Sequence, residues 1–148
     1  MVCYIYTKTN QIQMKKLIST NYSAGAFNTA MLLLRIVFGV LMMSHGYGKL
    51  TEFTETAKNM PSLFGMGSTV TTALVVFAEF FCALFIILGL FTRLATIPLI
   101  ITMAYAVFKA HNGDVFGEGA HAMLYLGAFI SLLIIGPGKI SVDGMIGK

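Results

Sequence analysis

The sequence predicts an all-α integral membrane protein, folded as an up-down four-helix bundle, and two observations support this prediction. Of the 148 residues, 57% are hydrophobic and only 11% are charged, whereas a soluble domain usually carries about 25% charged residues. The apolar residues also extend along most of the chain, which does not fit a single anchor attached to a soluble domain. The lipid bilayer is therefore the first partner that the composition predicts.

Four apolar windows predict the membrane spans. A helix that crosses a hydrocarbon core of about 30 Å needs about 20 mostly apolar residues. The windows that meet or approach this length are residues 29–49, 70–91, 94–110 and 119–136. The tight turn at 89–93 makes the second and third spans antiparallel neighbours, and short connections favour an up-down bundle.

The segments outside the spans are interpreted as tails. Residues 1–28 are polar and basic and lack the apolar core of a signal peptide, so we expect a cytoplasmic tail. Met14 is followed by two lysines, as at an ordinary bacterial start, and residues 1–13 are either native or an upstream extension. The membrane domain is expected over residues 29–143, and residues 144–148 form a C-terminal tail.

The basic residues predict the orientation in the cytoplasmic (inner) membrane of a bacterial-type cell. With four spans, six of them fall on the side of both termini and three on the side of the two longer connections, which places the termini in the cytoplasm. The six are Lys8, Lys15, Lys16, Arg93, Lys139 and Lys148, and the three are Lys49, Lys58 and Lys109. They form no stripe or arm, so nucleic acid is not an expected partner.

Two charged residues fall inside the predicted spans. Arg35 lies about two turns into the first span, and Glu79 lies near the middle of the second. An unpaired charge in lipid costs at least about 2.5–3.5 kcal/mol, so we predict an ion pair between them. Such a pair either only sets the helix register or forms the floor of a polar pocket, where Glu79 exchanges a proton.

Three histidines are predicted to meet on the non-cytoplasmic side, because His45 ends the first span, His111 ends the third and His121 begins the fourth. Three interpretations remain open: a polar cap without chemistry, a ligand or quinone head-group site that uses His45 and Lys49, and a metal or bis-histidine haem site. Haem is the weakest, because the chain has no C-x-x-C-H motif. Cys3 and Cys82 are too far apart in sequence for a C-x-x-C pair, and no metal site is predicted.

These residues define the predicted site. Arg35, His45, Lys49 and Glu79 are expected to line one polar pocket that opens toward the outer face, and the fourth span is expected to add His121 and Tyr125. His45 and Glu79 are the candidate catalytic residues, because both can exchange protons. The others are candidate ligand-binding residues, and the cations could stabilise developing negative charge.

Several short motifs, in their order along the chain, resemble the DoxX family of small four-helix membrane proteins. They are Arg35-Ile-Val-Phe-Gly39, His45-Gly-Tyr-Gly-Lys49-Leu50, Glu79 followed by Leu88-Gly-Leu90 and Thr92-Arg93, and Gly136-Pro-Gly-Lys-Ile-Ser141-Val-Asp143. The resemblance covers about residues 30–143. It implies the four-helix membrane fold.

The same resemblance implies a membrane subunit associated with quinone-linked oxidoreductase chemistry, like the related subunit of thiosulfate:quinone oxidoreductase. No motif for a flavin, nucleotide or iron–sulfur cluster occurs in the chain, so electrons would need a bound quinone, a haem or a soluble or membrane partner subunit. The alternative is a non-enzymatic scaffold, assembly factor or small-solute conduit. Whether the chain is an enzyme, and whether it forms a homo-oligomer, stay open at this point.

Overall fold

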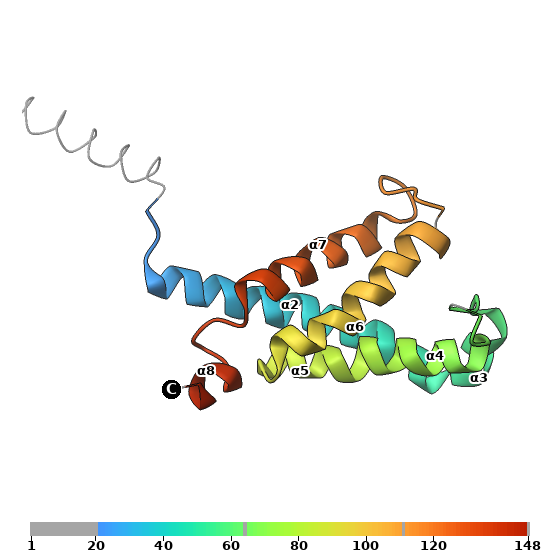
Figure 1. Cartoon of the computed structure of the whole chain (residues 1–148), viewed down its shortest axis with the longest axis horizontal. Coiled ribbons are helices and arrows are strands. Elements are labelled where there is room, and N and C mark those ends of the chain that lie inside the picture. Colours follow the sequence, from blue (N-terminus) through green and yellow to red (C-terminus); the bar gives the residue numbers. More distant parts are fainter. Residues whose placement is uncertain (1–20, 64, 111, 148) are drawn as a thin grey trace, which may run out of the picture.

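The computed structural model describes residues 21–63, 65–110 and 112–147, and every regular element among them is a helix (Figure 1). The predicted all-α fold class is therefore confirmed. The predictions made for residues 1–20 and for His111 fall outside the described residues. The first span is α2 (Ala24–Thr51), and the fourth apolar helix is α7 (Ala120–Ile135).

The middle spans are composite. The second consists of α4 (Ser68–Val76), the π-helical turn η1 (Phe77–Cys82) and α5 (Ala83–Leu88), and the third consists of α6 (Thr92–Tyr105) and a second π-helical turn, η2 (Ala106–Ala110). By length and composition, α2, Ser68–Leu88 and Thr92–Ala110 can each cross a membrane, whereas α7 has only 16 residues. Short helices occupy the first long connection, α3 (Phe53–Asn59), and the C-terminal segment, α8 (Val142–Ile146).

Local signals account for the helix ends. Ser23 caps α2, because its hydroxyl accepts a hydrogen bond of 3.1 Å from the amide of Ala26. Gly89 ends α5 with a φ of 71°, a left-handed conformation that glycine adopts without strain. Phe91 follows with a φ of 46° and begins the turn into α6. The predicted tight hairpin between the second and third spans therefore has a specific backbone cause.

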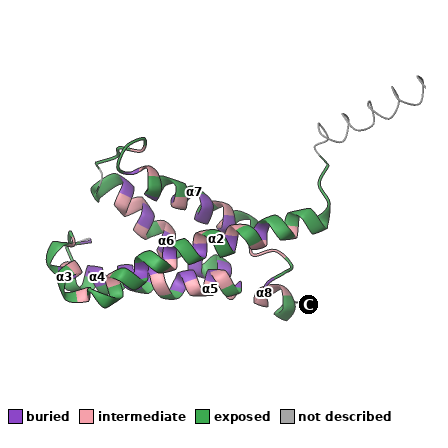
Figure 2. Cartoon of the chain, turned by 180° about the vertical axis from the view of Figure 1, so that it is seen from behind, coloured by how far each residue is buried: buried purple, intermediate pink, exposed green. Residues whose placement is uncertain are grey.

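The helices bury one face each and expose the other. Figure 2 shows buried positions following the inner sides of the spans and exposed positions on their outer sides. The core includes Met42, Ile86, Leu99, Phe129 and Leu132, all at most 1% exposed. Large apolar side chains on the outer faces, such as Leu94 and Leu124 at 67% exposure, belong in contact with lipid rather than water.

Two glycines set the register between α2 and the second span. A Cβ atom at Gly39 would lie 2.6 Å from Ile87 and 3.3 Å from the carbonyl oxygen of Ala83, and a Cβ at Gly46 would lie 2.6 Å from the backbone of Glu79. Only residues without a side chain allow the two backbones to come this close. The C-terminal half of α2 therefore lies directly against η1.

Candidate functional site

Most of the predicted site residues meet in one pocket. This pocket, of about 210 Å³, lies between α2, η1, the third span and α7. Its lining residues are Met42, His45, Lys49, Glu79, Met103, Ala106, Glu118, His121, Ala122 and Tyr125. The structure thus brings together five of the six side chains that the sequence suggested, and it leaves Arg35 elsewhere. Their chemical roles remain predictions.

An ion pair between Lys49 and Glu79 forms the polar centre of the pocket. The Lys49 Nζ donates to both carboxylate oxygens of Glu79, at 2.6 Å each. The Glu79 side chain is 3% exposed and that of Lys49 is 32% exposed. The carboxylate is therefore held inside the bundle, and the ammonium group reaches it from the open side.

The local backbone positions Glu79. It belongs to the π-helical turn η1, and π-helical turns inside α-helices often occur at functional sites. Gly46 lies against the backbone at Glu79, and Lys49 follows one helical turn later on the same side of α2. The close approach at Gly46 therefore brings the Lys49 side chain within reach of the carboxylate.

Aromatic rings form one wall of the pocket. The rings of His45 and Tyr125 are 6.1 Å apart and perpendicular, and Tyr125 stacks on Phe129 with centroids 6.0 Å apart. The Phe38 ring meets Tyr125 edge-on at 5.8 Å. His45 and His121 are both exposed, so they lie at the rim while Tyr125 lies further in. A flat, partly apolar ligand would find a ring surface here and an ion pair beside it.

Arg35 does not pair with Glu79, so that prediction is wrong. Arg35 is 1% exposed, and its guanidinium donates from Nη1 to the carbonyl of Pro137 (3.1 Å) and from Nη2 to the carbonyl of Ile140 (2.7 Å). A Cβ atom at Gly89 would collide with this guanidinium. Because Gly89 is ten residues beyond Glu79, Arg35 lies about 15 Å away along the helix axis.

The C-terminal segment closes the end of the bundle where Arg35 lies. The carboxylate of Asp143 accepts hydrogen bonds from the amides of Phe91 (2.8 Å) and Thr92 (2.9 Å), and the Asp143 amide donates to Gly89 (2.9 Å). Asp143 also interacts electrostatically with Arg35. The motif that ends in Asp143 therefore joins the turn after the second span to the first span.

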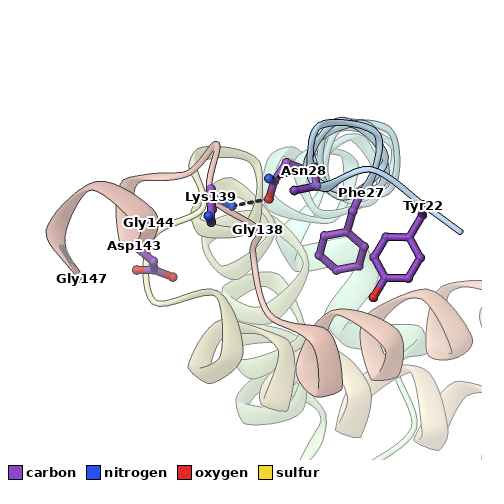
Figure 3. A pocket seen from close by; sticks show the side chains of 9 residues that line it. Tyr22, Phe27, Asn28, Gly138, Lys139, Asp143, Gly144 and Gly147 are labelled. Carbon is purple, nitrogen blue, oxygen red and sulfur yellow. Dashed lines mark hydrogen bonds between the residues drawn. The ribbon is translucent and has the colours of Figure 1, made fainter.

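A larger cavity, of about 630 Å³, lies beside this C-terminal segment. Figure 3 shows Tyr22 and Phe27 on one side of it and Asp143, Gly144 and Gly147 on the other. The amide of Lys139 donates to the Asn28 side chain at 2.8 Å, which joins the two sides. Among the described residues that line this cavity, none is a predicted proton-exchanging residue, so the smaller pocket at Glu79 is the better functional candidate.

The named set of predicted site residues did not include Gly46, Met42, Met103 or Glu118. Met42 and Met103 are buried apolar residues, whose type carries no signal of a pocket. Gly46 could have been recognised from its position one turn before Lys49 on the polar face of the first span. The partner of Lys49 could not be read from spacing, because it depends on how α2 crosses the second span.

The fold and the pocket define a class: a small helical membrane protein with several spans and a partly buried ion pair between two of them. Comparison with known proteins identifies the family. The DoxX family model matches residues 30–112, more than half of the chain. The chain therefore belongs to the DoxX family.

Two curated relatives come from Escherichia coli K12. The inner membrane protein YphA is 31% identical over 132 residues, covering 82% of this chain and 94% of the relative. The inner membrane protein YqjF is 28% identical over 127 residues, covering 82% and 95%. An uncharacterized protein of Haemophilus influenzae is 31% identical over 117 residues, covering 74% and 85%. No solved structure matches the chain significantly.

Proposed function

We propose that this protein is a bacterial inner-membrane subunit that holds a quinone head group in the Lys49–Glu79 pocket and works with an oxidoreductase partner. The observation that carries the proposal is the partly buried ion pair beside a wall of aromatic rings. The two inner membrane relatives support the location. The lengths and hydropathy of the spans support a protein with several membrane crossings.

The chemistry of quinone reduction matches the groups in the pocket. Reduction adds two electrons and two protons, and negative charge develops on the ring oxygens. Lys49 can stabilise that charge, and Glu79 or His45 can exchange the protons. The electrons would come from a partner subunit with a redox group. At about 210 Å³, the pocket is smaller than the roughly 300–1,000 Å³ of sites for drug-sized ligands, which suits a head group whose tail stays in lipid.

Co-purification tests the proposal. The protein is extracted in mild detergent from its native membrane, and bound small molecules and proteins are identified by mass spectrometry. We expect quinone and a redox partner with the wild type. The amount of quinone that co-purifies should fall at least about tenfold in the His45→Ala and Lys49→Ala variants. Each variant loses a contact worth at least about 1.4 kcal/mol.

The matched control is Lys58→Ala, which removes a cation from an exposed i,i+3 pair outside the pocket. It should leave the quinone content unchanged. A folded wild type that is free of quinone, or pocket variants that keep quinone and any quinone-linked activity of the assembly, would exclude the proposal. A quinone-free protein that captures one soluble partner would instead favour the scaffold alternative.

A further inference from the structure

The ion pair in the pocket restricts which ligands can enter without leaving a buried charge. Glu79 has only 3% of its side chain exposed, and Lys49 is its salt-bridge partner. A ligand that draws Lys49 away would leave the Glu79 carboxylate uncompensated in a medium of low dielectric, which is costly. The net charge of the pocket therefore has to be conserved when a ligand takes the place of Glu79 at Lys49.

Only one class of polar ligand can take the place of Glu79 at Lys49 and leave the net charge of the pocket unchanged. An anion alone would add a negative charge next to Glu79, and a cation would face the Lys49 ammonium. A neutral acid HA can give its proton to the Glu79 carboxylate and leave A⁻ on Lys49. This proton transfer balances as HA + Glu79⁻·Lys49⁺ → Glu79–H + A⁻·Lys49⁺.

We propose that the pocket binds planar ring acids by this proton exchange: the acid anion pairs with Lys49 while Glu79 takes the proton. The inference rests on the same pocket as the proposed function and narrows its ligand to acidic rings, of which hydroxyquinones are the quinone members. The perpendicular His45 and Tyr125 rings, 6.1 Å apart, provide the wall against which a flat ring packs.

The two partners differ in their freedom to move. Glu79 is held by η1 and by the close approach of Gly46, where even a Cβ atom would lie 2.6 Å from its backbone. Lys49 is about one-third exposed and lies in the last turn of α2 on a flexible four-carbon stem. Lys49 is therefore the group that turns to a ligand, and Glu79 is the fixed base.

Other ionisable groups around the pocket could take the proton instead, so the test has to separate them. They are His45 on α2, Glu118 before α7, and His121 and Tyr125 on α7. From the described part of the third span, the pocket receives Met103 and Ala106, neither of which is ionisable. Glu79 takes the proton, because it is the group that loses its counter-ion when Lys49 moves.

The test is calorimetry with the full chain in lipid vesicles, using lawsone, a hydroxynaphthoquinone about as acidic as a carboxylic acid, and its methyl ether. Lawsone is an anion in neutral buffer, so its binding to the wild type should take up one proton per bound molecule. Repeating the titration in buffers with different heats of ionisation measures this proton uptake. The affinity for lawsone should fall about tenfold for each unit of rising pH, since binding consumes a proton. The ether has no acidic proton to give to Glu79, so it should bind more weakly than lawsone and without proton uptake.

Variants assign the proton. Glu79→Gln mimics the protonated carboxyl group, so it should bind the lawsone anion without proton uptake, independently of pH and more tightly than the wild type above neutral pH. Lys49→Met should lose lawsone binding at least about tenfold. His45→Ala and His121→Ala remove pocket side chains, so they should bind lawsone more weakly but still take up one proton per bound molecule. The exposed control Glu55→Gln should change neither the affinity nor the proton uptake. Circular dichroism confirms that each variant is folded.

Proton uptake that persists in Glu79→Gln, or lawsone binding to the wild type without proton uptake, would overturn the inference. These results are independent of native quinone. If lawsone shows the proton exchange but no quinone co-purifies, the ring-acid site stands and the quinone function falls. If quinone co-purifies but lawsone binds without a proton, the quinone function stands and the exchange falls.

Discussion

At the scale of single residues, Arg35 and Glu79 are each stabilised by a different partner. Arg35 has a planar guanidinium that donates to two carbonyl groups of the C-terminal segment. Glu79 receives both of its short contacts from the compact ammonium of Lys49. Each choice fits the chemistry, since a guanidinium fork can serve two acceptors at once and a lysine acts as a point charge.

Double-mutant cycles should separate these two arrangements. Glu79→Gln and Lys49→Met should couple, because removing one partner leaves the other charge unpaired. Glu79→Gln alone should cost between the surface value of about 1 kcal/mol and the roughly 3–5 kcal/mol of a buried pair. Unfolding in detergent, followed by circular dichroism, measures both quantities.

The matched cycle combines Glu79→Gln with Arg35→Met. These two changes should add to within about 0.5 kcal/mol, as expected for sites more than about 10 Å apart. Arg35→Met alone should cost about 3 kcal/mol or more, because it removes two hydrogen bonds from a charged donor. Strong coupling between Arg35 and Glu79 would show that the charges meet in the membrane.

At the scale of elements, the approach of α2 to η1 determines the site. Gly46 lets the two backbones touch, and the ion pair forms one helical turn away. Gly48 lies two residues further along, on a side of α2 where an added Cβ atom would have nothing within 4 Å. The two glycines therefore provide a direct test of close packing within one helix.

Gly46→Ala should destabilise the protein by about 1–3 kcal/mol, because its new methyl group would force α2 away from η1. Ligand binding in the pocket should weaken as well, since Lys49 would move away from Glu79. Gly48→Ala should be neutral or stabilising by up to about 1 kcal/mol, because alanine has the better helix propensity. If Gly46→Ala and Gly48→Ala changed the free energy of unfolding in detergent equally, helix propensity alone would account for the effect at Gly46. The close contact between α2 and η1 would then not limit the size of residue 46.

At the scale of the whole molecule, the two ends of the bundle have different roles. One end carries the Lys49–Glu79 pocket, and the other is closed by Arg35 and Asp143 through the C-terminal segment. The short α7 packs mainly on α6, and it brings His121 and Tyr125 to the pocket end. The pocket end is the end of the two longer loops, which the distribution of basic residues predicts to lie outside the cytoplasm.

The orientation itself stays a prediction and can be measured. In a background with Cys3 and Cys82 replaced by serine, a cysteine at exposed Ser62 should react with a membrane-impermeant reagent added from outside. A cysteine at exposed Lys139 should react only after the cytoplasmic side is opened. The reverse pattern would invert the topology and place the pocket toward the cytoplasm.

The sequence by itself determined the fold class and the four apolar segments to within about five residues at each end. Of the six site residues that it predicted, five line the pocket. These features depend on composition and on local helical periodicity, which can be read along one segment at a time. The sequence also indicated that charges inside the spans need partners. This requirement holds whatever the packing is, because it comes from the lipid.

Only the tertiary structure decided which charges meet. The predicted Arg35–Glu79 pair followed from the cost of unpaired charges in lipid, whereas the close contacts at Gly39 and Gly46 set a register that puts Arg35 beside Gly89. The π-helical turn at Glu79 and the fold of the C-terminal segment over Arg35 also depend on contacts between distant parts of the chain. Partner choice is a property of the packed bundle, because it depends on distances across helices that no single segment specifies.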